Sequence, residues 1–134
     1  MIIAVDFDGT IVEHKYPSIG REKPGAIDTL KQLAREGNLL ILWTVRDGER
    51  LEEAIEYCRG RGLEFYAVNS NTPQNVPIYG SRPATGKISA DVYIDDRNLG
   101  GLPDWDEIYT QLTGLRQQWR KSRKKGFWAK LFGK

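Results

Sequence analysis

Six polar residues stand at or beside the ends of apolar segments of the chain, and their side chains suit the handling of a phosphate ester. Four carboxylates at one site repel one another, so a cation is needed to offset their charge. Carboxylate oxygens favour Mg²⁺ over zinc, and an added hydroxyl and ammonium complete a pocket for a phosphoryl dianion. These residues are Asp6, Asp8, Thr44, Lys87, Asp95 and Asp96.

The spacing of the first two acids is itself suggestive of a reaction. A carboxylate beside Mg²⁺ can attack phosphorus and form an aspartyl-phosphate. A second carboxylate two residues later can move a proton to the leaving group and take one from water. Asp6 and Asp8 have this spacing.

Alternating strands and helices are predicted to position these residues. Each helix shows an apolar stripe, and Pro24, Asp47 and Asp104 mark the expected helix starts. Gly37 is placed to end the first helix in a left-handed conformation. The expected strands are residues 2–5, 39–43, 63–68 and 92–94.

This alternation predicts an α/β fold, a Rossmann-like three-layer sandwich with a mostly parallel sheet. In such sheets ligands bind beyond the carboxyl ends of the strands. The residues that leave the strands at that edge are therefore the candidates for chemistry.

The same residues resemble the four motifs of the haloacid dehalogenase (HAD) superfamily of phosphohydrolases. Asp-Phe-Asp-Gly-Thr at residues 6–10 resembles the first motif, and Thr44 the second. Lys87 resembles the third, and the pair at residues 95–96 the paired-acid form of the fourth. The motifs occur in the family's order, and the resemblance covers about residues 1–110.

The resemblance implies a role for each aspartate. Asp6 would be the nucleophile and one ligand of Mg²⁺. Asp8 would be the general acid and base, and would give its backbone carbonyl to the metal. One of Asp95 and Asp96 would bind Mg²⁺ directly, and the alignment favours Asp96.

The resemblance also implies the phosphoryl-binding residues. Thr44 would hold a phosphoryl oxygen with its hydroxyl, and Lys87 would neutralise phosphoryl charge and orient Asp6. Arg82 is near enough in sequence to compete for the role of Lys87. Arg46 follows Thr44 by two residues and is a further candidate for substrate contact, equally explained as a surface charge where a helix begins.

No cap domain fits between the motifs. Between Thr10 and Thr44 lie 33 residues, of which the helix expected over residues 24–37 takes 14. Only a short segment around residues 11–20 remains. We therefore expect a capless enzyme with an open site. Its substrate would be a small phosphorylated molecule or an exposed phosphate on a larger one, unless a homo-oligomer covers the site.

The leading hypothesis is a Mg²⁺-dependent phosphomonoester hydrolase, and rivals from other classes stay open. Phosphoryl transfer to an acceptor other than water would use the same residues. A non-enzymatic phospho-receiver domain also gathers acids, a threonine and a lysine, but it carries its phosphorylated aspartate on the third strand. Residues 63–68 here end in no acid. A catalytically idle binding module would not need both Asp6 and Asp8.

The net charge of +2 conceals two unlike parts. Residues 1–115 carry 12 basic and 18 acidic residues, a net charge of −6, which disfavours a domain that binds nucleic acid over its whole surface. Residues 116–134 carry eight basic residues and no acid. We expect a catalytic domain over residues 1–115 and a basic, aromatic-containing tail over residues 116–134.

The tail has three competing interpretations. It is a solvated helix end, or an amphipathic face that contacts an anionic membrane or a protein partner, or, ranked third, a nucleic-acid contact. Phe127, Trp128, Leu131 and Phe132 would form the apolar side of such a face.

The expected location is the cytoplasm, with peripheral membrane contact through the tail as the variant. Cys58 is the one cysteine, which excludes an intrachain disulfide and fits a reducing compartment. The first residues have no basic region before their apolar run, unlike a secretory signal peptide. No apolar run reaches the length of a membrane span.

Overall fold

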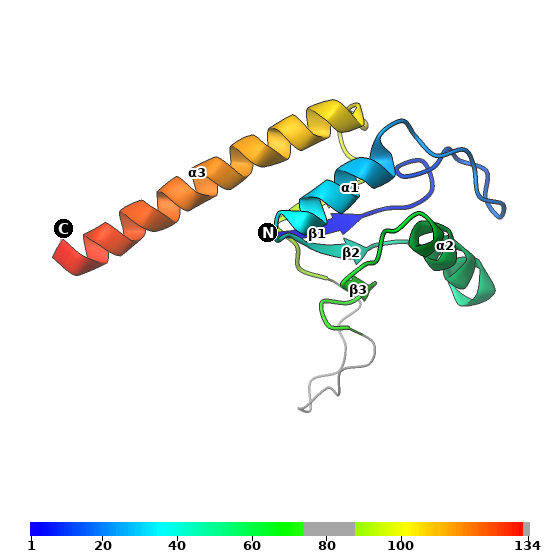
Figure 1. Cartoon of the computed structure of the whole chain (residues 1–134), viewed down its shortest axis with the longest axis horizontal. Helices are drawn as coiled ribbons and strands as arrows, with labels where there is room; N and C mark the ends of the chain where they lie inside the picture. The colour runs from blue at the N-terminus through cyan, green and yellow to red at the C-terminus, as the bar shows by residue number, and fades with distance from the viewer. Residues whose placement is uncertain (74–87, 133–134) are drawn as a thin grey trace. The chain divides into compact units, whose positions relative to one another are not determined.

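The computed structural model describes residues 1–73 and 88–132 of the chain, which divides into two compact units, Met1–Leu102 and Pro103–Lys134 (Figure 1). The first unit holds a parallel sheet in the order β3-β2-β1-β4. Its strands are β1 (Ile2–Val5), β2 (Leu39–Leu42), β3 (Ala67–Val68) and β4 (Val92–Ile94). The helices of the chain are α1 (Ala26–Arg35), α2 (Gly48–Gly60) and α3 (Trp105–Phe132).

This order confirms the predicted α/β class with a Rossmann-like parallel sheet. β1 pairs with β2 on one side and with β4 on the other. In register, Val5 stands opposite both Leu42 and Ile94, the last residues of their strands. The residues that follow these three strands therefore leave the sheet at one edge.

Apolar β-branched and leucine side chains make the strands the centre of the core. Ala4, Ile41, Ala67 and Ile88 form one buried cluster, which joins three strands to the segment before β4. α1 packs close to β2. Cys58 of α2 is fully buried, as expected of a core residue, and burial raises the pKa of its thiol to about 12.

Three element boundaries differ from the prediction, and the smallest difference is in β2, which was expected over residues 39–43 and ends at Leu42. α1 begins at Ala26 and not at Pro24, because Gly25 takes a left-handed conformation with φ of 77° and acts as the N-cap. The third strand was expected over residues 63–68, but only Ala67–Val68 pair with β2. β4 has the predicted bounds.

Glycine ends both helices of the first unit. Gly37 follows α1 with φ of 92°, as predicted, and its N–H donates to the carbonyl of Ala34. The N–H of Asn38 then donates to the carbonyl of Leu33, which completes the Schellman pattern. Gly62 ends α2 with φ of 82° in the same way. These turns direct the chain from each helix toward the next strand.

Residues 13–21, here called the flap, form an excursion between β1 and α1. Val12 makes an antiparallel bridge to Glu22 at its base. The N–H of Glu13 donates to the carbonyl of Arg21, and the N–H of Lys23 donates to the carbonyl of Ile11. The flap thus begins and ends at a short paired stem beside the end of β1.

The second unit consists mainly of α3, which continues without a break across the boundary expected at residues 115 and 116. The basic tail is therefore helical as far as Phe132. Of the predicted apolar stripe, Ile108 and Leu112 are buried, whereas Leu115 is 46% exposed.

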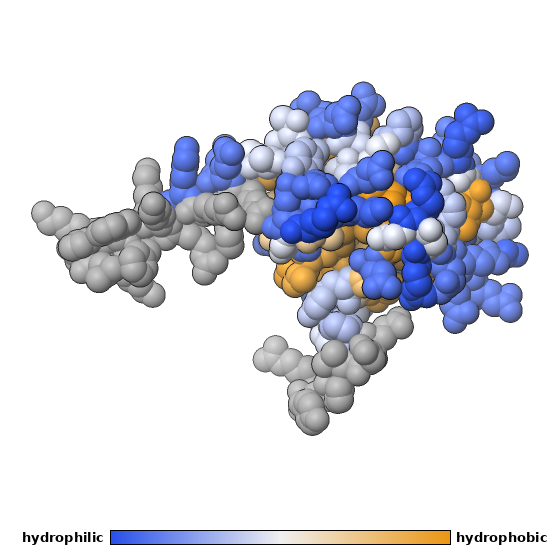
Figure 2. Space-filling view, in the orientation of Figure 1, coloured by the Kyte–Doolittle hydropathy of each residue, from blue (hydrophilic) through white to orange (hydrophobic). Residues whose placement is uncertain are grey.

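The described residues include no helix with both the length and the apolar composition that crossing a membrane requires. Figure 2 shows a largely hydrophilic surface over the first unit, with apolar residues visible in limited areas.

Asn38 is a buried amide that stands directly before β2. Its Nδ2 donates to the carbonyl of Leu33 at 2.9 Å, and its Oδ1 accepts from the amino group of Met1 at 3.0 Å. Asn38→Ala removes the partner of the Met1 amino group and one of two donors to the Leu33 carbonyl, and this loss of two hydrogen bonds should lower the free energy of unfolding by about 1–3 kcal/mol. Urea denaturation measures the change.

The matched control is Asn98→Ala, which removes an amide whose bond to the carbonyl of Tyr93 is exposed to solvent. Its cost should stay within about 0.5 kcal/mol. Equal losses in the two variants would contradict a special role for Asn38.

Candidate functional site

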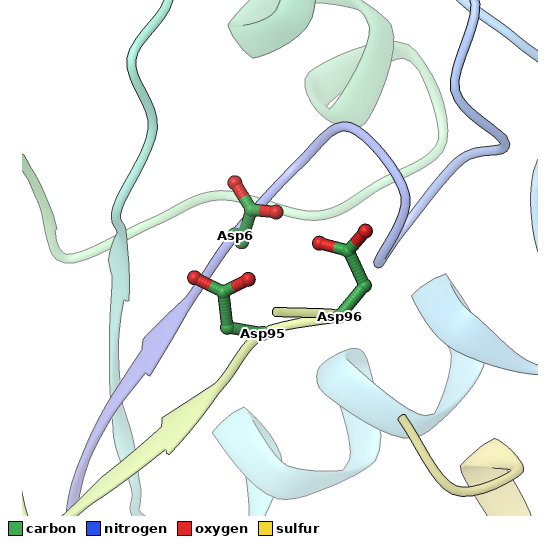
Figure 3. Close-up of side chains that lie close together, drawn as sticks. All are labelled: Asp6, Asp95 and Asp96. Carbon is green, nitrogen blue, oxygen red and sulfur yellow. The ribbon is translucent and has the colours of Figure 1, made fainter. Parts of the chain in front are cut away.

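Three of the predicted carboxylates meet at the carboxyl ends of β1 and β4. Asp6 follows β1, and Asp95 and Asp96 follow β4. One oxygen from each lies within 4.8 Å of the other two, and Figure 3 shows the carboxylates turned toward a common space. All three are half-buried. We call this set the acidic cluster.

The main chain fixes this convergence. The N–H of Asp6 donates to the carbonyl of Ile94 at 2.9 Å, which extends the β1–β4 pairing by one residue. The N–H of Arg97 donates to Oδ1 of Asp95 at 2.9 Å and holds that side chain in a turn. The cluster therefore lies on the end of a rigid sheet, where side chains keep their mutual positions.

Thr10 connects the two sides of the cluster. Its hydroxyl donates to Oδ2 of Asp6 at 3.2 Å and accepts the N–H of Asp96 at 3.0 Å. The residue is fully buried. Sequence analysis gave Thr10 no role of its own, although its place as the last residue of the Asp-Phe-Asp-Gly-Thr motif was the signal.

The surroundings of Asp6 disfavour the ionised form of its carboxyl group. Burial and the negative charge of Asp95 raise the pKa of Asp6 from 3.8 to about 7, and a hydrogen bond with Asp96 adds to the increase. The hydrogen bond from the backbone N–H of Phe7, and that from Thr10, act in the opposite direction without cancelling it. A cation at this point would reverse the balance, because it stabilises the ionised carboxylate.

Asp96 has a feature that fits a cation. Its Oδ1 is buried, and no donor among the described residues reaches it. Its Oδ2 lies 3.5 Å from Nε2 of His14, an exposed residue of the flap. A buried carboxylate oxygen without a donor is costly unless it is a ligand, so the donor set suits Mg²⁺.

Gly9 is required for this arrangement. Its φ is +84°, and a Cβ atom there would lie 2.3 Å from Oδ2 of Asp96 and 2.7 Å from Cδ2 of His14. Only a residue without a side chain lets the loop after Asp8 approach the cluster so closely.

The carboxylate of Asp8 is not a member of the acidic cluster. It is nearly buried and forms a two-bonded ion pair with Arg46, with Nε donating to Oδ2 at 2.7 Å and Nη2 to Oδ1 at 2.8 Å. The side chain of Asp8 is thus held by a cation of the protein itself. Any contribution of Asp8 to a metal site would come from its backbone carbonyl, as the resemblance implies.

Arg46 was predicted as a candidate for contact with the substrate, and in the structure its guanidinium bonds to other groups of the protein. Its side chain is fully buried, and its N–H groups donate to Asp8 and to three backbone carbonyls. The alternative of a surface charge at a helix start is wrong, because the Arg46 side chain is buried. The Asp8 carboxylate raises the pKa of Arg46 further, so the guanidinium is a permanent charge.

Thr44 lies at the predicted edge, after β2. Its N–H donates to Oδ1 of Asn69 at 2.9 Å, and its hydroxyl accepts the N–H of Arg46 at 3.1 Å. A hydroxyl that accepts one bond still has its own hydrogen to donate. The geometry therefore retains the capacity of Thr44 to donate to a phosphoryl oxygen.

Lys87 and its competitor Arg82 lie outside the described residues. The chain on either side of residues 74–87 is held together: Oδ1 of Asn71 accepts the N–H of Ser89 at 2.7 Å, and Nδ2 donates to the carbonyl of Ser89 at 2.6 Å. Ile88, next to Lys87 in sequence, is buried in the core cluster. The side chains of the two asparagines after β3, Asn69 and Asn71, are thus bonded to segments distant in sequence, at Thr44 and Ser89.

Comparison with known proteins shows a family but no activity. The sequence matches no protein-family model and no curated protein. A solved structure, described as that of a conserved protein from Bacteroides thetaiotaomicron, is 56% identical in sequence with a TM-score of 0.76. The match covers 85% of this chain and 90% of that chain. At this identity and coverage, the chain belongs to the same family as the conserved Bacteroides thetaiotaomicron protein.

Proposed function

We propose that the protein is a Mg²⁺-dependent phosphomonoester hydrolase of the HAD type, acting through an aspartyl-phosphate on Asp6. The observation that carries the proposal is the acidic cluster: three carboxylates from two adjacent strands, at the edge where parallel sheets bind ligands. The unpartnered Oδ1 of Asp96 and the raised pKa of Asp6 support a cation at this point.

Asp6, Asp96 and Asp95 would hold the metal, together with the backbone carbonyl of Asp8. When bound, Mg²⁺ would offset the repulsion between the carboxylates and an incoming phosphoryl dianion. Asp6 would then be ionised and would attack phosphorus, releasing the alcohol and leaving an acyl phosphate on its own carboxylate, which water then cleaves to release inorganic phosphate. Thr10 keeps Asp6 oriented, because its hydroxyl donates to Oδ2 and leaves the other carboxylate oxygen to react.

Asp8 would supply the proton to the leaving oxygen and later take one from water, and for this one of its carboxyl oxygens must be released from Arg46 and protonated. Its position two residues beyond the nucleophile favours a hydrolase over the dehalogenases of the superfamily. Thr44 would donate to a phosphoryl oxygen, and Lys87 would neutralise phosphoryl charge. Transfer of the phosphoryl group to water is the simplest reaction. Transfer of the phosphoryl group to another acceptor is the alternative, and it would use the same residues.

A phospho-receiver domain is disfavoured by the position of the acids. Such a domain would need an aspartate after β3, and the residue there is Asn69, whose side chain accepts the N–H of Thr44. The substrate would be a small phosphate ester or an exposed phosphate of a larger molecule.

Metal dependence is the first test. Purified full-length protein, assayed against a panel of phosphomonoesters, should require Mg²⁺ because unscreened carboxylates repel the substrate dianion. EDTA should remove turnover, and an excess of Mg²⁺ should restore it. Equal rates in Mg²⁺ and in EDTA would refute the proposal.

The raised pKa of Asp6 yields a test that needs no substrate. The metal-free folded state binds the Asp6 proton more tightly than the unfolded chain, so its stability should fall as pH rises from about 4 to about 7. The loss should be about 1–2 kcal/mol, since solvent screens a half-buried group. Asp6→Asn has no such charge and should be the more stable protein at pH 8 without metal.

Thermal unfolding of both proteins at pH 5 and pH 8 measures this difference. Mg²⁺ should raise the midpoint of the wild type at pH 8 more than that of Asp6→Asn. Parallel pH profiles in the two proteins would contradict the assignment of the pKa to Asp6.

Substitutions of the two aspartates of the first motif should have different effects on turnover. Asp6→Asn should abolish turnover, because an amide is no nucleophile. Asp8→Asn should lower turnover by about 10²–10⁴-fold for alkyl phosphates, and least for nitrophenyl phosphate, whose leaving group needs little protonation. Mg²⁺ binding by Asp8→Asn should remain close to that of the wild type. A loss that is uniform across leaving groups would remove Asp8 from the acid role.

A further inference from the structure

The guanidinium of Arg46 occupies a junction between segments that are distant in sequence. Two of its bonds go to Asp8, after β1. Nη2 also donates to the carbonyl of Ser18 at 2.9 Å, and Nη1 donates to the carbonyl of Pro17 at 3.3 Å, both in the flap. A last bond from Nη1 reaches the carbonyl of Arg50 at 3.3 Å, in the first turn of α2. The five N–H donors of a guanidinium match these five bonds.

Two aromatic rings complete the enclosure. The guanidinium carbon lies 5.1 Å from the ring centroid of Phe7, which is buried, and 5.1 Å from that of Tyr16, which belongs to the flap. Stacking of this kind strengthens when the cation is desolvated. The flap therefore contributes a ring and two carbonyls to a site that also fixes Asp8.

Neutralising Asp8 would require only the two bonds to its carboxylate. The bonds to Pro17 and Ser18 serve no electrostatic need of Asp8, and they exist because the planar fork of arginine can reach both at once. A lysine has one compact charge and cannot satisfy the same acceptors. The position of the Asp8 carboxylate and the conformation of the flap are thus set by one side chain.

We propose that Arg46 is a positioning residue, which couples the flap to Asp8 so that the Asp8 carboxylate is placed for its part in turnover. This inference rests on the proposed phosphohydrolase function. Arg46 is buried and its N–H groups donate to Asp8 and to backbone carbonyls, so its influence on the reaction would pass through Asp8.

The first arm of the test measures hydrogen exchange of the flap amides in the full-length protein. Arg46→Met should speed exchange of the Glu13 amide, which donates to the carbonyl of Arg21 at the base of the flap, by about ten- to a hundredfold, because the flap loses the charge-assisted bonds that hold it. The matched control is Arg50→Met, which removes an exposed guanidinium and keeps the carbonyl that Arg46 uses. Its flap exchange should stay within about twofold of the wild type.

Arg46→Met leaves Asp8 buried without its counter-charge, and this variant can be too unstable to fold. The double variant Arg46→Met/Asp8→Asn has no unpaired charge and should show the same fast exchange confined to the flap. Unchanged flap exchange in the double variant, or acceleration shared equally by β1 and α1, would overturn the coupling.

The second arm is a double-mutant cycle on turnover. Arg46→Met should lower kcat by about ten- to a hundredfold and change KM little, because a misplaced catalytic group affects the reaction more than binding. In the Asp8→Asn background the same change should lower kcat by less than about threefold, since Asp8 no longer acts. Arg46→Lys, which keeps a charge, should retain part of the kcat.

Losses that multiply in the cycle would show that Arg46 acts independently of Asp8 and would refute the inference while the hydrolase activity of the wild type stands. If the wild type hydrolyses no phosphomonoester, the proposed function fails and the role of Arg46 in turnover fails with it. The exchange arm then decides separately whether Arg46 holds the flap.

Discussion

Mutual repulsion among carboxylates at one edge of a parallel sheet is the constraint on which the rest of the site depends. The register of β1 with β4 places Asp6 beside Asp95 and Asp96 at one edge of the sheet. The cost is visible in the pKa of Asp6, which rises to about 7. Repulsion within the metal-free cluster lowers the stability of the fold, and a bound cation would remove that repulsion. Groups with perturbed pKa values of this kind are common at functional sites.

The protein divides its acids between two kinds of partner. Asp8 has a permanent internal cation in Arg46, and both of its oxygens are occupied. The acidic cluster instead has a hydroxyl, a few backbone N–H groups and the exposed imidazole of His14. Two carboxylates separated by one residue thus have opposite electrostatic surroundings. Different environments for paired carboxylates are how one site assigns them different roles.

The fold class and much of the candidate site could be predicted from sequence, since they depend on local patterns. Short apolar runs that end in polar residues predicted the strands, and parallel topology then required Asp6, Asp95 and Asp96 to share an edge. Gly37 ended its helix as expected, because a left-handed residue after a helix favours glycine. The 63–68 strand was too long, since strand length depends on a neighbour to pair with, and pairing begins only at Ala67.

The amino-acid sequence by itself determined which residues stand at the strand ends, because the period of apolar residues and the chain order of motifs are local properties. The tertiary structure decided which of those side chains face one another. The partnership of Asp8 with Arg46 spans 38 residues and depends on how the flap and α2 approach the end of β1. Thr10 became a bridge between Asp6 and Asp96 for the same reason. Such contacts follow from packing in three dimensions, which no spacing along the chain encodes.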